Sequence, residues 1–347
     1  MDDRTEDRSL DEANLNASPS VTVVVPVLNE VRYIGRCVES ILNQDYPQDR
    51  LDVVIVDGMS TDGTRELIEE LMLRDGRITL LDNPQVIQSA GMNLGVAQSL
   101  SSFICRLDSK SWVDPDYLRK CVLTAQRTGA GNLGGRRVSV GTGRKQEGIA
   151  WGMSSRYGAS HYAYSTVGGS VQTIYPGFIS RDAGDAIGWF DEHVGVHEDF
   201  DFNTRLRASG RDVYMDPDIV IYYSPRENLG KLTTQYFRYG RSKSSLARQG
   251  RPVVSLRNLI APLFVVSVIL LVITSAVIGT PLPILAYLVL YFLTLFVLAI
   301  PRGVRSPVEV LATTSARVIA LSCMHFSWGT GFLVGLLRRS TYTVFDE

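Results

Sequence analysis

The stretch that most constrains the fold runs from Leu51 to Thr64 and reads LDVVIVDGMSTDGT. It opens with an unbroken apolar, β-branched run, which is typical of an inner strand in a parallel sheet covered on both faces. Asp57 ends this strand, and Gly58 allows a sharp turn into a helix. Ligands bind at the carboxyl edge of open α/β sheets, so Asp57 is a candidate binding residue. An ordinary turn with a solvated aspartate has the same pattern, because turns favour Asp and Gly.

The rest of residues 21–250 alternates strand and helix patterns, which predicts α/β architecture. Apolar runs predict further strands over 21–27, 78–81, 102–107 and 170–179. Helical spacing predicts helices that follow Glu30, Asp62 and Asp114, a glycine-containing helix through Gly91 and Gly95, and helices over 198–206 and 229–249. Pro115 is expected in the first turn of its helix, where proline is tolerated. After Asn132 the pattern loosens.

Two further groups of residues carry chemistry. Asp108 follows the strand over 102–107, so a second carboxylate emerges at what we expect to be the same sheet edge. The run His197-Glu198-Asp199-Phe200-Asp201 opens a helix, where acids also complement the helix dipole. Three acids and a histidine within five residues exceed what a helix cap needs, which favours a functional role. The helix over 229–249 is basic and aromatic, and it either lies on anionic lipid or binds a diphosphate.

Composition changes sharply near residue 258. No charged residue occurs from Leu259 to Ile278 or from Leu282 to Ile300. About 20 helical residues span roughly 30 Å of hydrocarbon, so these runs predict a membrane hairpin. Arginines on both flanks place both ends in the cytoplasm.

The third apolar segment, over 308–337, carries Glu309, Arg317 and His325. A full crossing would place Arg338 and Arg339 outside, against the charge bias. A span, a re-entrant segment and an in-plane helix all remain open. The predicted organisation is a disordered tail over 1–20, an α/β domain over 21–250 and a membrane region over 251–340, with helices over about 259–278 and 282–300.

Composition limits the other possibilities. The formal net charge of -1 provides no basic field, so nucleic acid is not an expected partner. The four cysteines show no paired metal spacing, which favours a reduced compartment. The first 20 residues lack the apolar core of a signal peptide.

Taken together, the ordered motifs resemble the family 2 glycosyltransferases with a GT-A fold, a Rossmann-like, mostly parallel nucleotide-binding sheet flanked by helices. Within that family the chain is similar to membrane-attached enzymes of succinoglycan and exopolysaccharide assembly. The resemblance covers Val21 to about Leu337. The matching motifs are VVVPVLNE, VVIVDGMSTDGT, NPQVIQSAGMNLGVAQS, the acidic turn after FICRL, HEDFDFNTRL and QYFRY.

The resemblance implies roles for individual residues. Asp57 binds the uracil of a nucleotide sugar, which suits a carboxylate that accepts from the imide N–H. Asp199 matches the catalytic base, and Asp108 matches the first acid of the metal-binding motif. The nucleotide-sugar site comprises Pro26, Asn29, Glu30, Asp57, Asn93, Asp108 and Lys110. The acceptor and diphosphate site comprises Glu198, Gln235, Arg238 and Tyr239, although tryptophan is the more usual last residue of the Gln-x-x-Arg-aromatic motif.

Lys110 departs from the family pattern, because it stands where a second acid or a histidine is usual, and a protonated lysine cannot ligate a metal. Either Asp108 and the diphosphate hold Mg²⁺ or Mn²⁺ with water, or Lys110 supplies the cation that the leaving group needs. We favour a weakened metal site.

The implied activity is inverting transfer from a nucleotide sugar, expected to be a UDP-sugar, to a lipid-linked or oligosaccharide acceptor. An anchored active site would meet such an acceptor at the cytoplasmic face of the inner (plasma) membrane, in exopolysaccharide or envelope glycan synthesis. Two rivals are a sugar-phosphate nucleotidyltransferase and a non-catalytic, membrane-bound nucleotide-sugar binding or scaffold protein. The first strand lacks a glycine-rich, lysine-bearing phosphate loop, which counts against the nucleotidyltransferase.

Overall fold

A computed structural model describes residues 18–158, 166–194, 196–250, 254–303 and 306–337. Almost all of the predicted tail over 1–20 lies outside the described residues. The chain forms two compact units. Of the described residues, the first unit comprises 18–137 and those within 166–223, and the second comprises 138–158 and those within 224–337. The predicted domain limits at 21–250 and 251–340 remain a prediction.

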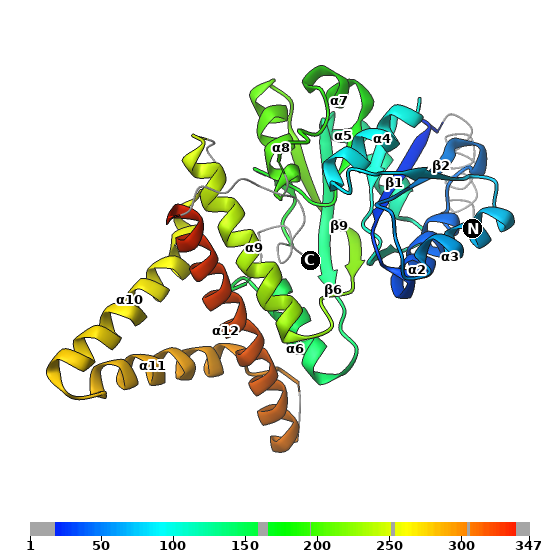
Figure 1. The fold of residues 1–347 in the computed structure, drawn as a ribbon. Helices are drawn as coiled ribbons and strands as arrows, with labels where there is room; N and C mark the ends of the chain where they lie inside the picture. Colours follow the sequence, from blue (N-terminus) through cyan, green and yellow to red (C-terminus); the bar gives the residue numbers. More distant parts are fainter. Residues whose placement is uncertain (1–17, 159–165, 195, 251–253, 304–305, 338–347) are drawn as a thin grey trace, which may run out of the picture. The chain divides into compact units, whose positions relative to one another are not determined.

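The first unit contains a mixed sheet whose amino-terminal half is parallel (Figure 1). Its strands are β1 (Val21–Val27), β2 (Leu51–Asp57), β3 (Ile78–Asp82) and β4 (Phe103–Arg106). They pair in the order β3-β2-β1-β4, and all three pairings are parallel. This confirms the predicted parallel half of the sheet. Because Asp57 ends β2 and Asp108 follows β4, both carboxylates emerge at the carboxyl edge, two strand spacings or roughly 10 Å apart.

Helices cover both faces of this parallel half. One face buries Val23 and Val25 of β1 in a core shared with three helices. These are α2 (Val31–Leu42), α3 (Thr64–Arg74) and α5 (Tyr117–Thr128). The opposite face presents Val24 to α4 (Gln88–Gln98), where a Cβ at Gly95 would collide with the valine side chain. The close approach of α4 to β1 therefore requires glycine.

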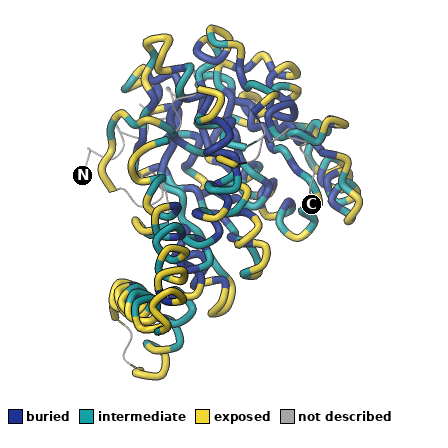
Figure 2. Tube along the Cα trace, turned by 60° about the vertical axis from the view of Figure 1, so that its left-hand side comes forward, coloured by how far each residue is buried: buried dark blue, intermediate teal, exposed yellow. Residues whose placement is uncertain are grey.

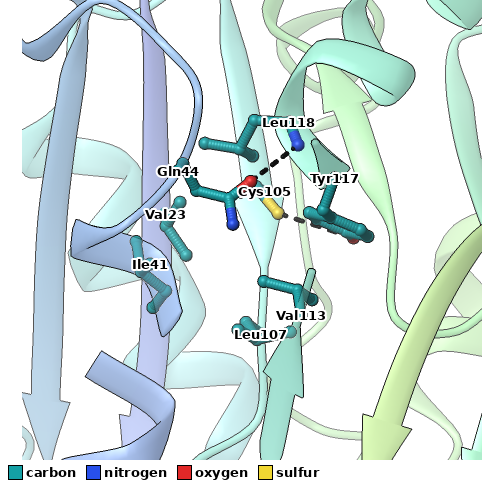
Figure 3. Close-up of a pocket in the computed structure, with 8 residues that line it drawn as sticks. All are labelled: Val23, Ile41, Gln44, Cys105, Leu107, Val113, Tyr117 and Leu118. Atoms are coloured by element: carbon teal, nitrogen blue, oxygen red, sulfur yellow. Dashed lines mark hydrogen bonds between the residues drawn. The ribbon is translucent and has the colours of Figure 1, made fainter. Parts of the chain in front are cut away.

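The core on the first face contains the small pocket shown in Figure 3. Apolar side chains from β1, α2, α5 and residues 105–113 line it, together with Gln44, whose Oε1 accepts from Leu118 N at 2.9 Å. Cys105 faces the Tyr117 hydroxyl there, and burial raises the pKa of its thiol to about 12. With no charged group in its lining, this pocket is part of the hydrophobic core. All four cysteines of the chain are free.

The second half of the sheet is antiparallel. Its strands are β5 (Ser111–Val113), β6 (Asn132–Ser139), β7 (Gly169–Ser170), β8 (Phe178–Ser180) and β9 (Val213–Tyr223). The strand predicted over 170–179 is wrong, because the structure has only the short strands β7 and β8 near its two ends. β6 escaped prediction because its sequence, NLGGRRVS, combines two glycines with two arginines and lacks an apolar run. Strands β1 and β2 are almost entirely buried, and Figure 2 marks the buried residues of the chain in dark blue.

The remaining elements of the first unit are short. They are the 3-10 turn η1 (Gln48–Arg50), α7 (Arg181–Ile187) and α8 (Glu198–Ala208). The predicted helix start at Pro115 is wrong by two residues, because α5 begins at Tyr117 and Asp116 occupies the N-cap position without a side-chain cap hydrogen bond.

A buried amide pair fixes α8 against the sheet. Asn203 is fully buried, and its Oδ1 accepts from Asn132 Nδ2 of β6 at 2.7 Å. Its Nδ2 donates to Thr173 Oγ1 and Ile174 O, both at 3.0 Å. Every polar atom of this side chain is therefore used, which sets the position of the acidic start of α8 one helical turn away.

The second unit is helical. Its helices are α6 (Gly143–Ser154), α9 (Leu229–Arg248), α10 (Leu256–Ile278), α11 (Leu282–Ala299) and α12 (Pro307–Leu337). Helices α10 and α11 cover the two charge-free runs, and the tight turn between them contains Gly279 with a φ of 75°. In the described residues, α10, α11 and α12 are long and apolar enough to cross a membrane.

Candidate active site

The loops that follow β1 and β2 are joined around Asp57. This carboxylate is fully buried, and it accepts from Ser60 N at 3.1 Å and from Ser60 Oγ at 2.6 Å. Arg65 Nη1 lies 3.4 Å from it and 2.6 Å from Asp82. Asn29 binds the same turn, because its N–H donates to Ser60 Oγ and its Oδ1 accepts from Thr61 N. The loop geometry that surrounds Asp57 is thus set by hydrogen bonds between the two loops.

Glu30 and Lys110 form an ion pair next to these loops. Lys110 Nζ lies 3.0 Å from Glu30 Oε1 and 4.8 Å from the centre of the Tyr33 ring. Pro26 belongs to β1 itself and is half-buried. The pair connects the residues that follow β1 with those that follow β4, at the carboxyl edge where Asp57 also lies.

Asp108 lies at the centre of a second group of side chains. Its Oδ1 accepts from Arg106 Nε at 3.2 Å and from Gln88 Nε2 at 3.4 Å. Its Oδ2 accepts from the Tyr175 hydroxyl. The Arg106 guanidinium also lies 4.8 Å from the centre of the Tyr175 ring. Three donors therefore hold this carboxylate, one of them charged.

Arg106 also connects Asp108 to the acidic start of α8. Its Nη1 lies 2.8 Å from Glu198 Oε1, and both side chains are buried. Burial alone would lower the pKa of Arg106, but the charges of Asp108, Glu198 and Asp199 outweigh it and raise the pKa. Burial raises the pKa of Glu198, an effect that the Arg106 charge opposes. The structure therefore pairs two predicted site residues, Asp108 and Glu198, with one buried cation, and Asp199 is the residue that follows Glu198 on α8.

The structure places the other predicted residues in different settings. Asn93 binds the segment before α8, because its Nδ2 donates to Phe190 O and to Glu192 Oε1. Glu198 forms an ion pair with Arg106. In the second unit, Gln235 of α9 is buried and donates to the Tyr239 hydroxyl at 2.9 Å, while Arg238 is exposed. The ligand contacts assigned to these residues remain predictions.

Sequence reasoning missed Arg106, Tyr175 and Gln88. A signal for Arg106 existed, because an arginine inside the apolar strand FICRL is a buried charge that requires partners. Tyr175 and Gln88 carry no such signal, since their contacts with Asp108 arise from distant parts of the fold.

The described residues show no metal site at Asp108, whose two carboxylate oxygens already accept from Arg106, Gln88 and Tyr175. No three His, Cys, Asp or Glu side chains group as a metal cage within the described part of the chain. Mg²⁺ is commonly bound through one or two carboxylates plus substrate phosphates. Asp108 is therefore suited to hold a divalent ion only together with a diphosphate.

Comparisons with known proteins identify the family of the chain. Residues 22–191 match the family described as Glycosyl transferase family 2. The succinoglycan biosynthesis protein ExoA of Rhizobium meliloti is 32% identical over 92% of this chain and 96% of its own length. A dolichyl N-acetyl-α-D-glucosaminyl phosphate 3-β-D-2,3-diacetamido-2,3-dideoxy-β-D-glucuronosyltransferase of Methanococcus voltae is 28% identical over 66% of this chain and 74% of its own length.

A solved structure has the same fold. The mannosyltransferase PcManGT of Pyrobaculum calidifontis, in complex with GDP-Man and Mn²⁺, superimposes with a TM-score of 0.60. It covers 88% of this chain and 86% of its own, at 21% identity. Fold and relatives define the class of protein as a glycosyltransferase with a GT-A fold. The chain belongs to glycosyl transferase family 2.

Loss of Arg106 is expected to destabilise the first unit. Arg106→Met leaves the buried Glu198 without its cation, which typically lowers the free energy of unfolding by about 3 kcal/mol or more. Arg50→Met is the matched control, because Arg50 pairs with Asp49 at an exposed site and its loss should stay within about 0.5 kcal/mol. Urea unfolding of both variants measures the difference. Equal stabilities would contradict the central role of the buried arginine.

Proposed function

We propose that this glycosyltransferase moves a sugar, with inversion, from a UDP-sugar to a lipid-linked or oligosaccharide acceptor. The observation that carries the proposal is that Arg106 pairs both with Asp108 and with Glu198, the residue before Asp199, in a sheet whose carboxyl edge also carries Asp57. A donor-side carboxylate and a candidate base are thereby held in one group. This arrangement suits a displacement in which the two groups act on opposite sides of one sugar.

Asp199 is the proposed general base. It removes the proton from the acceptor hydroxyl as that oxygen attacks the anomeric carbon, on the face opposite the nucleotide. Such proton transfer typically contributes about 100-fold to 10,000-fold in rate. The half-exposed position of Asp199 at the start of α8 supports this role, because a base must be reachable by the acceptor.

The donor is the proposed ligand of the loops after β1 and β2. Asp57 recognises the uracil, and Pro26, Asn29 and Glu30 contact the nucleoside. Lys110 stabilises the negative charge that develops on the departing diphosphate. Asp108 would hold Mg²⁺ or Mn²⁺, which supplies further positive charge at the phosphates when bound. Roles for Asn93, Glu198, Gln235, Arg238 and Tyr239 at the donor, diphosphate and acceptor remain predictions from the sequence resemblance.

The cellular setting is proposed from the membrane helices and the relatives. Three helices are long and apolar enough to cross a membrane. One relative is named for succinoglycan biosynthesis, and another for transfer to a dolichyl-phosphate-linked sugar. We place the chain in the inner (plasma) membrane, with the catalytic domain cytoplasmic, in exopolysaccharide or related envelope glycan synthesis.

Substitution of Asp199 tests the base. Asp199→Asn should lower kcat at least about 100-fold while donor binding is retained, because the amide cannot accept the proton. Asp201→Asn on the same helix is the control and should keep near-normal turnover, since Asp201 Oδ2 is held by Arg205 Nε at 2.9 Å. Transfer of radiolabel from a panel of sugar nucleotides into the organic phase, in membranes with native lipid extract, measures turnover. Near-normal turnover of Asp199→Asn would reject the assignment.

Chelation tests the weakened metal site. EDTA should lower both transfer and the affinity for UDP, and Mn²⁺ or Mg²⁺ should restore them, because the diphosphate completes the metal shell. UDP binding measured by calorimetry provides a readout separate from turnover. Full activity and unchanged UDP affinity after chelation would show that no metal takes part. Lys110→Ala should then cause the greater loss of turnover. Lys120→Ala is its control, since Lys120 pairs with Asp116 at an exposed site.

A further inference from the structure

Helices α9 and α12 pack tightly along each other within the second unit. A Cβ added at Gly240 of α9 would collide with Trp328 O, and one added at Gly331 of α12 would collide with Phe237 O. At the end of the pair, Arg248 Nη1 donates to Leu336 O at 3.1 Å. Contacts between two backbones leave little freedom for sliding, so the two helices occupy the membrane or its surface together.

Helix α9 is strongly cationic. It contains five basic residues and no acid, namely Lys231, Arg238, Arg241, Lys243 and Arg248. Of these, Lys231, Arg238 and Arg248 are exposed. Charged side chains in the hydrocarbon are costly, and their long stems favour the headgroup region. Since α12 is bound to α9, the same constraint applies to α12.

Helix α12 also closes the open end of the α10–α11 hairpin (Figure 1). Arg317 Nη1 donates to Ala299 O, at the end of α11, at 3.0 Å. Trp328 Nε1 donates to Asn258 O, at the start of α10, at 3.4 Å. These two points on α12 are about 16 Å apart along its axis. Each of these two points contacts one end of the hairpin, next to its charged flank. The charged flanks are expected at the membrane surface, so α12 stays at one depth between the two points.

Helix α12 differs from the two helices of the hairpin in how much of it is buried within the protein. Of the apolar window of α12, 56% is buried within the protein, compared with 17% for α10 and 11% for α11. Helix α6 covers its first half, where a Cβ at Gly148 would meet the Ala316 backbone. The hairpin instead exposes a charge-free apolar surface that includes Ile273, Val277 and Leu285. Lipid is the partner that suits the hairpin surface, whereas protein already covers most of α12.

We propose that α12 lies in the plane of the membrane interface together with α9, and that only the α10–α11 hairpin enters the hydrocarbon. The partner of the α9–α12 pair is the lipid headgroup layer. The continuous helical course of α12 also excludes a re-entrant segment, which needs a turn. The chain then has two crossings, and the end of α12 at Leu337 lies on the same side of the membrane as the start of α10. This inference rests on the proposed membrane location.

Cysteine labelling of the full chain tests the number of crossings. One variant carries a cysteine appended after Glu347, a second carries Leu73→Cys on α3, where the leucine is 90% exposed, and a third carries Thr280→Cys in the hairpin turn. An impermeant maleimide is applied to spheroplasts and to inverted vesicles. The appended cysteine should react together with Leu73→Cys, and Thr280→Cys should react from the other side.

An appended cysteine that reacts from the side opposite Leu73→Cys would overturn the inference, because α12 would then cross. Recovery of the protein in the carbonate-washed membrane fraction is measured in parallel. Absence from that fraction would contradict the proposed membrane location itself, so the two failures are distinguishable.

Depth measurements provide a second test that leaves the packing intact. Leu311, Ile319 and Thr330 are exposed positions spread along α12. Spin labels at these positions should report one shared depth in bilayers from the accessibility of oxygen and of a water-soluble nickel complex. A crossing helix would instead give a deep label at Ile319 and shallow labels at the other two positions, which would overturn the inference.

Discussion

The interaction on which the rest of the site depends is the burial of Arg106 between Asp108 and Glu198. A buried guanidinium costs several kcal/mol in lost hydration unless charged partners surround it. Its partners come from the turn after β4 and from the start of α8, so the cation is stable only when these two segments meet. The same meeting brings Asp199 to the group, since it is the next residue along α8. A structural requirement for charge pairing therefore brings the proposed base near Asp108.

Contacts with neighbouring side chains hold this cation in place. Tyr175 contacts both Arg106 and Asp108, and Asn203 attaches α8 to β6 and to the segment that carries Tyr175. Buried networks of this kind favour a single arrangement of their side chains. In the second unit, the apolar surface belongs to the α10–α11 hairpin and the basic residues belong to α9, so the two kinds of surface lie on different helices.

The sequence predicted the parallel half of the sheet because its strands are local apolar runs, as in residues 51–57. It predicted Asp57 and Asp108 at one edge, since strand ends in a parallel sheet share an edge. It could not predict β6 or the division of residues 170–179, because these strands form by pairing with distant partners and have little apolar pattern of their own. The pairing of Arg106 with Glu198 could not be predicted either, because the two residues are distant in the sequence. A charge inside an apolar strand indicated only that some partner exists.

A double-mutant cycle on kcat/KM tests the central claim most directly. The cycle combines Arg106→Met with Glu198→Gln, with folding of each variant verified by its unfolding curve. If the ion pair positions the base, the two losses should be far from additive, with a coupling free energy of at least about 1 kcal/mol. Losses that add within about 0.5 kcal/mol would show that the two residues act independently, and would contradict the account.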